Sequence, residues 1–135
     1  MESHEIIART AEHLRKLHEG DSSGHDWWHI WRVWQSALTL GREERADLFV
    51  VELAALLHDI ADWKFHGGDD TAGPRAAREW LAQFGVDSAI VDHVCEIIAG
   101  LSYKGAGVDT TMRTLEGRVV QDADRLDALV AEAQR

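Results

Sequence analysis

Hydrophobic residues recur with a helical period along almost the whole chain. Apolar positions three or four residues apart are separated by turn-forming clusters of Gly, Asp and Ser, and the sequence contains neither a convincing alternating strand pattern nor an internal repeat. The pattern therefore predicts an all-α fold. Its helices should cover approximately residues 6–20, 26–41, 43–60, 71–84, 87–101 and 111–135.

Glycine, proline and threonine mark the expected helix ends. Pro74 falls in a first helical turn, where its missing N–H costs little, and Gly85 closes the same helix. Gly41 is read as the end of the second helix, and Thr110 or Thr111 as the N-cap of the last one. None of the connections resembles an interdomain linker.

Composition indicates one soluble globular domain over residues 1–135, because 45% of the residues are hydrophobic and 28% are charged. No stretch approaches the roughly 20 apolar residues of a membrane span, and the N-terminus lacks the basic-then-apolar order of a signal peptide. We therefore expect a cytoplasmic protein without a membrane partner. Cys95 lies within an apolar helical pattern and is expected to be a small core residue.

The formal net charge of −10 argues against a nucleic-acid polymer as partner, because such binding depends on clustered Lys and Arg. A small phosphorylated ligand stays open, since a bound divalent cation can supply positive charge that the surface lacks.

The second helix carries an apolar stripe of Trp27, Ile30, Trp31 and Trp34, which favours core packing over a stacking platform for bases. Another face of this helix presents His29 together with Arg32. A lone histidine on a helix is usually only a hydrogen-bonded side chain, so His29 by itself does not indicate a metal site.

The pair His58-Asp59 ends the apolar helical run 50–57, where plain core residues would be expected. Two adjacent polar residues of the ligand type at the end of a buried helix need a partner. A metal ion is the obvious one.

Three carboxylates, those of Asp122, Asp124 and Asp127, lie close together in the last helix. Asp124 is flanked on its helix face by Val120 and Ala128, which indicates that it points inward and needs a cation, a proton or several donors. The alternative is that Asp122 and Asp127 are solvated and that Asp124 pairs with an arginine.

Together, His29, His58, Asp59 and Asp124 offer imidazole nitrogens and carboxylate oxygens from three helices. This set lacks the thiolates of a structural zinc site and suits one divalent Mn, Co, Fe, Ni or Mg ion with positions left open for water. Open positions imply catalysis rather than structural stabilisation.

The order His, His-Asp, Asp resembles the HD-domain metal-dependent phosphohydrolase superfamily. The resemblance extends to stand-alone bacterial HD hydrolases of the group that includes nucleotide pyrophosphohydrolases. It is carried, in order, by His29-Ile30-Trp31-Arg32-Val33-Trp34, Leu56-Leu57-His58-Asp59-Ile60-Ala61-Asp62-Trp63-Lys64, Leu101-Ser102-Tyr103-Lys104-Gly105 and Val120-Gln121-Asp122-Ala123-Asp124-Arg125-Leu126-Asp127-Ala128.

The resemblance implies an HD-domain helical bundle of about five to six helices, with one divalent ion held by His29, His58, Asp59 and Asp124. It favours Asp124 over Asp122, because the family's final aspartate is commonly followed by a basic and then an apolar residue.

His25-Asp26 is out of family order and is interpreted as an N-cap beside a histidine that binds no metal. Members of the group continue past the final aspartate motif, so the chain, which ends at Arg135, is expected to be short at its C-terminus.

The implied activity is metal-dependent hydrolysis of a small phosphorylated metabolite, with a nucleotide favoured as substrate for a pyrophosphohydrolase or phosphatase. Asp62 lies about one helical turn after Asp59 and is expected to act as general acid/base or to position water. Its alternative is a solvated carboxylate at a helix end. The substrate phosphates are expected to contact four cationic residues, Arg32, Lys64, Lys104 and Arg125.

Each cation also has a simpler interpretation. Arg32 could pair with Asp59 or Asp124, and Lys64 could serve only the helix dipole. Lys104 has the strongest claim and is expected to act in catalysis as well, because it begins a Gly-rich loop that can approach a ligand.

Other functions remain open from sequence. One alternative is a non-catalytic metal- and nucleotide-binding regulatory HD module. Another is an oxygen-activating di-iron enzyme on an HD-like scaffold, which would hold two irons per chain. Separately, His66 and His93 are candidate ligands of a second metal, as the resemblance to HD phosphodiesterases implies. The Trp-rich surface and the early C-terminus are compatible with a homodimer.

Overall fold

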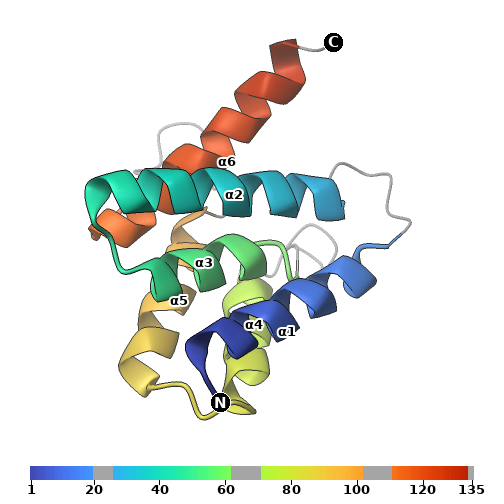
Figure 1. Ribbon diagram of the computed structural model, residues 1–135, viewed down its shortest axis with the longest axis vertical. Coiled ribbons are helices and arrows are strands. Elements are labelled where there is room, and N and C mark those ends of the chain that lie inside the picture. The colour runs from blue at the N-terminus through green and yellow to red at the C-terminus, as the bar shows by residue number, and fades with distance from the viewer. Residues whose placement is uncertain (20–25, 62–70, 102–110, 134–135) are drawn as a thin grey trace.

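The computed structural model describes residues 1–19, 26–61, 71–101 and 111–133, and these residues form six helices and no strand (Figure 1). The all-α prediction is confirmed. In chain order the helices are α1 (Ser3–Leu17), α2 (Trp27–Glu44), α3 (Leu48–Leu57), α4 (Ala72–Ala82), α5 (Ser88–Leu101) and α6 (Leu115–Ala133).

Helix α3 forms the centre of the core. A helix that is apolar all round must be surrounded by other elements, and α3 packs against α1, α2, α5 and α6. Its buried residues are Val50, Val51, Leu53, Ala54, Ala55, Leu56 and Leu57. The C-terminal end of α3, where His58 follows, is therefore held by tight packing on several sides.

Helix α2 continues past Gly41, so the prediction that this glycine ends the helix is wrong. The helix ends at Glu44, and Arg45 adopts the left-handed conformation that terminates it, with φ 58°. A Cβ at Gly41 would lie 3.0 Å from Cδ2 of Leu48. The glycine thus permits close approach of α2 and α3 instead of breaking a helix.

Helix α6 begins later than predicted. Thr111 precedes the helix without capping it, and Thr110 lies outside the described residues. The side chain of Thr114 instead accepts a hydrogen bond from the backbone N–H of Gly117 at 3.1 Å, which satisfies one donor of the first turn.

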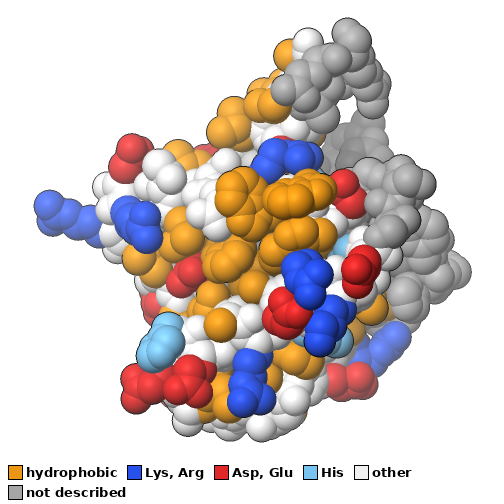
Figure 2. Space-filling model, turned by 45° about the vertical axis from the view of Figure 1, so that its right-hand side comes forward, with side chains coloured by type: hydrophobic (Ala, Val, Ile, Leu, Met, Phe, Trp, Pro, Cys, Tyr) orange, Lys and Arg blue, Asp and Glu red, His pale blue; other side chains and the backbone are white. Residues whose placement is uncertain are grey.

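The predicted apolar stripe of α2 is only partly buried. Ile30 is fully buried and Trp27 and Trp34 pack against the core, but Trp31 is 40% exposed, so its assignment to the core is wrong. Figure 2 shows hydrophobic side chains gathered in the middle of one face, bordered by acidic and basic ones.

Cys95 of α5 is buried, as predicted.

Helices α2 and α6 pack against each other and bring distant parts of the chain together. The C-terminal part of α6 projects beyond the other helices (Figure 1). Within the described residues, none of the helices combines the length and the apolar character that a membrane crossing needs.

Candidate metal centre

His29 is placed by the first turn of α2. Asp26 is the N-cap residue, and its Oδ1 accepts a hydrogen bond from the backbone N–H of His29 at 3.1 Å. The prediction that Asp26 caps this helix is confirmed. The cap fixes the first turn and with it the direction in which the His29 side chain leaves the helix.

His58 follows directly after α3, and its side chain is only 4% exposed. Its Nδ1 lies 2.6 Å from the backbone carbonyl oxygen of Ala55 and donates a hydrogen bond to it. Because the proton of the neutral ring is then on Nδ1, Nε2 is left with a lone pair directed away from the helix.

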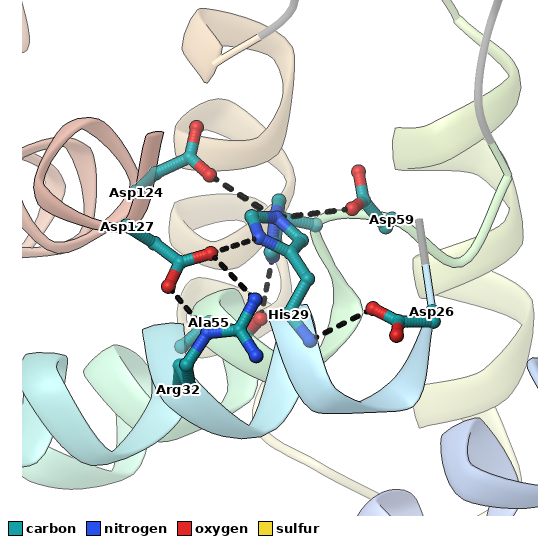
Figure 3. A network of polar contacts seen from close by, with 8 residues as sticks. Asp26, His29, Arg32, Ala55, Asp59, Asp124 and Asp127 are labelled. Atoms are coloured by element: carbon teal, nitrogen blue, oxygen red, sulfur yellow. Dashed lines mark hydrogen bonds and ion pairs between the residues drawn. The ribbon is translucent and has the colours of Figure 1, made fainter. Parts of the chain in front are cut away.

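Two imidazoles and two carboxylates converge at this point (Figure 3). Nε2 of His29 lies 3.3 Å from Nε2 of His58. Oδ2 of Asp59 lies 3.5 Å from Nε2 of His29 and 3.4 Å from Nε2 of His58. Oδ1 of Asp124 lies 3.4 Å and 3.5 Å from the same two nitrogens. Figure 3 shows the two carboxylates approaching from opposite sides.

The donor set fits a divalent ion. Ligand atoms about 2.1 Å from one ion lie about 3.0 Å apart when adjacent in an octahedron and about 3.4 Å apart in a tetrahedron. Among the two imidazole nitrogens and either one of the carboxylate oxygens, the observed separations of 3.3–3.5 Å are close to these values. The ligand atoms of His29, His58 and Asp59 lie within 4.8 Å of one another. Asp124 is not part of that group, and its Oδ1 contacts the two imidazole nitrogens from the opposite side (Figure 3).

The electrostatics of the cluster call for positive charge. Burial disfavours the charged form of His58, but the Asp59 and Asp124 carboxylates outweigh it and raise the pKa of His58 to about 10. For His29, burial likewise opposes the charge, yet Asp124 and the other carboxylates raise its pKa. The pKa of Asp124 is lowered, because the two imidazoles outweigh the effect of its burial. Without a metal, protons supply the charge that a cation would bring.

Asp127 contacts the far side of His29. Its Oδ2 accepts a hydrogen bond from Nδ1 of His29 at 2.7 Å, and its Oδ1 accepts one from Nε of Arg32 at 2.6 Å. Burial tends to raise the pKa of Asp127, but the bonds from Arg32 and His29 lower it. The alternative of a solvated Asp127 is therefore wrong. The signal that sequence reasoning overlooked is its spacing, three residues after the inward-pointing Asp124.

A sequence model of the HD domain matches residues 27–129. The chain belongs to the HD domain family. The matched segment contains all four candidate ligands, His29, His58, Asp59 and Asp124, so the family resemblance seen in the sequence is confirmed.

Several bacterial proteins are similar over most of the chain. The Bacillus subtilis (strain 168) protein YpgQ is 43% identical over 114 residues, which are 82% of this chain and 54% of YpgQ. A solved HD-superfamily hydrolase from Bacillus thuringiensis is 37% identical with a TM-score of 0.76, covering 98% of this chain and 64% of that one. The structure of Bacillus subtilis YpgQ in complex with ADP is 42% identical with a TM-score of 0.66, covering 87% and 60%. The chain thus spans only about half the length of its curated relative YpgQ.

The other predicted site residues differ in where they lie. Arg32 forms an ion pair with Asp127, a partner that the sequence does not predict. Asp122 and Arg125 are exposed on α6. Three further predicted site residues lie outside the described part of the chain: Asp62, Lys64 and Lys104.

The candidate ligands of a second metal are not brought to the centre within the described residues. His93 hydrogen-bonds with its Nε2 to Oγ1 of Thr114 at 2.8 Å and lies 3.9 Å from Glu116. The other candidate, His66, lies outside the described residues, and so does His25, which is expected to bind no metal.

Proposed function

We propose that this HD domain holds one divalent metal ion through His29, His58, Asp59 and Asp124 and hydrolyses a small phosphorylated metabolite. The observation that carries the proposal is a pair of imidazole Nε2 atoms 3.3 Å apart, with one oxygen of Asp59 and one of Asp124 each 3.4–3.5 Å from both nitrogens. Mixed nitrogen and oxygen ligands suit Mn, Co, Fe, Ni or Mg.

A divalent ion in such a site lowers the pKa of a bound water and neutralises charge on a phosphate. The chain's own part is to supply neutral imidazoles from His29 and His58 and negative charge from Asp59 and Asp124. Asp62 is assigned the proton transfer on its place in the family motif, three residues after Asp59. Helical spacing does not support this assignment, because α3 ends at Leu57.

The substrate we favour is a nucleotide, cleaved as a pyrophosphohydrolase or a phosphatase would cleave it. Two aspartates neutralise the charge of one divalent ion, so a phosphate chain needs further cations. Lys64, Lys104 and Arg125 are assigned this contact on their place in the family motifs. The ADP complex of YpgQ supports a nucleotide as the ligand class.

The test is hydrolysis by protein stripped with a chelator and reloaded with Mn²⁺, Co²⁺ or Mg²⁺. A panel of nucleoside mono-, di- and triphosphates is assayed for phosphate and for pyrophosphate separately. We expect release from at least one nucleotide, loss of release in Asp59→Ala, and retention in the control Asp122→Asn, which changes an exposed carboxylate of α6.

Melting temperatures measured with the same nucleotides, together with elemental analysis of the bound metal, separate the alternative functions. Nucleotides that raise the melting temperature without any turnover would support the regulatory module, and two irons per chain would support the di-iron enzyme. Absence of hydrolysis with every metal and every phosphoester would contradict the proposed activity.

A further inference from the structure

We propose that Asp127, anchored by Arg32, is the positioning residue that fixes the His29 ring for metal binding. The inference rests on the proposed metal site, and neither the family match nor the relatives assign a role to Asp127. It follows from a difference between the two imidazoles of the centre.

The two imidazoles are oriented by different kinds of partner. His58 donates from Nδ1 to the backbone carbonyl oxygen of Ala55, which the turns of α3 hold in place. His29 instead contacts a carboxylate of another helix, since Oδ2 of Asp127 lies 2.7 Å from its Nδ1. The side chain of Asp127 is only 8% exposed. The orientation of His29 therefore depends on a side chain of α6.

The hydrogen bond also selects the tautomer. A carboxylate can only accept, so the neutral His29 ring must carry its proton on Nδ1 and expose the Nε2 lone pair to Asp59, Asp124 and His58. An anionic acceptor raises the basicity of the imidazole more than a neutral carbonyl does. Of the two histidines, His29 should therefore be the stronger metal ligand.

Arg32 holds Asp127 in this position. Its Nε donates to Oδ1 at 2.6 Å and its Nη2 to Oδ2 at 3.3 Å, so both carboxylate oxygens are engaged by α2. A buried carboxylate requires such compensation. Since Arg32 is one helical turn after His29, these two neighbouring side chains of α2 both hydrogen-bond to Asp127 of α6.

The contact should also hold Asp124 in place. Asp124 lies one helical turn before Asp127 on α6, so fixing the latter against α2 fixes the turn that presents the former. Asp127 would thus support two of the four ligands without touching the ion.

The test compares the Kd for Mn²⁺, measured by calorimetry, in the unmodified protein, Asp127→Asn and the matched control Asp122→Asn. An asparagine keeps the shape but offers only one oxygen, so either Arg32 or His29 would face an NH₂ donor. We expect the Kd of Asp127→Asn to rise about 10- to 100-fold, and that of Asp122→Asn to stay unchanged. Metal-free melting curves of both variants separate lost affinity from lost folding.

A double-variant cycle tests the role of Arg32. If Arg32 acts through Asp127, Arg32→Gln weakens Mn²⁺ binding and adds nothing further in the background of Asp127→Asn. Independent, multiplying effects, or a change in KM for the nucleotide with unchanged Mn²⁺ affinity, would overturn the link and favour a direct phosphate contact by Arg32.

The outcomes distinguish this inference from the proposed function. Absence of Mn²⁺ binding in the unmodified protein overturns both, whereas tight binding that Asp127→Asn leaves intact overturns only the role of Asp127. Should Asp127→Asn fail to fold, nitrogen NMR of the unmodified, zinc-loaded protein decides. A proton on Nδ1 of His29 with the metal on Nε2 supports the inference, and the reverse arrangement overturns it.

Discussion

The Nε2 atoms of His29 and His58 lie 3.3 Å apart, and the Nδ1 of each ring is engaged by an acceptor on its other side. When both rings are neutral, two lone pairs therefore face each other. This arrangement is unfavourable unless a proton or a metal ion lies between the nitrogens. The packing of α2 and α3 thus maintains a pair that needs a cation.

Replacing one member of the pair should remove metal binding. We expect His58→Ala to raise the Kd for Mn²⁺ by more than about 100-fold, beyond the loss typical of residues that only support a ligand. Competition with a fluorescent chelator measures it. His4→Ala is the control, because His4 is an exposed histidine of α1. Equal affinity in the two variants would exclude His58 as a ligand.

Metal binding should strengthen as the pH rises. The carboxylates overcome burial and raise the pKa of His58 from its usual 6.5 to about 10, so Mn²⁺ must displace a proton at neutral pH. From about pH 6 to about pH 8 the affinity should increase about tenfold per pH unit for each proton displaced. Calorimetry in buffers of different ionisation enthalpy counts these protons, and pH-independent affinity without proton release would contradict the account.

The unfolding free energy of the metal-free protein should fall as the pH rises above neutrality, whereas the affinity for Mn²⁺ rises. Because the folded state raises the pKa of His58, its stabilising contribution is complete below the unfolded value of about 6.5 and is lost as the pH rises towards about 10. The lowered pKa of Asp124 makes its contribution complete above its ordinary range and lost in acid. Chemical unfolding across pH should show a decline above neutrality that His58→Ala removes. An identical pH profile in both proteins would refute this assignment.

The N-cap of α2 should matter for the metal as well as for stability. Asp26→Ala removes the bond to the N–H of His29 and should cost about 1 kcal/mol of unfolding free energy. It should also weaken Mn²⁺ binding, because the first turn of α2 frays. Asp47→Ala removes the comparable cap of α3, where Oδ1 accepts from Phe49 N–H, and serves as control. A metal affinity reduced equally by both variants would indicate general destabilisation instead.

The central position of α3 predicts a large effect of truncation in the core. Leu53 is fully buried, so Leu53→Ala should destabilise the protein by about 2–5 kcal/mol. Leu129 on α6 is 67% exposed, and Leu129→Ala should change stability by less than about 0.5 kcal/mol. Urea unfolding measures both. Similar costs for the two leucines would contradict the packing described for α3.

The sequence predicts which face of a helix points inward better than it predicts which side chains of two helices contact each other. Periodicity and motif order were sufficient to nominate His29, His58, Asp59 and Asp124, which the fold brings together. The sequence does not predict the contact of Asp127 with His29, because the two residues lie 98 positions apart and no local pattern indicates such a contact.

Local signals also have more than one physical cause. The sequence predicts a helix end at Gly41, but this glycine permits close packing on Leu48 within a continuing helix. Trp31 fits the apolar stripe of α2 yet remains 40% exposed, because the neighbouring helices do not cover that edge. Both cases depend on tertiary packing, which periodicity alone does not describe.

The most direct measurement of the central claim is anomalous diffraction from crystals of the protein loaded with Mn²⁺. The account predicts one strong peak per chain, within bonding distance of Nε2 of His29, Nε2 of His58 and carboxylate oxygens of Asp59 and Asp124. A peak bound by other residues, or the absence of any peak at saturating Mn²⁺, would contradict it.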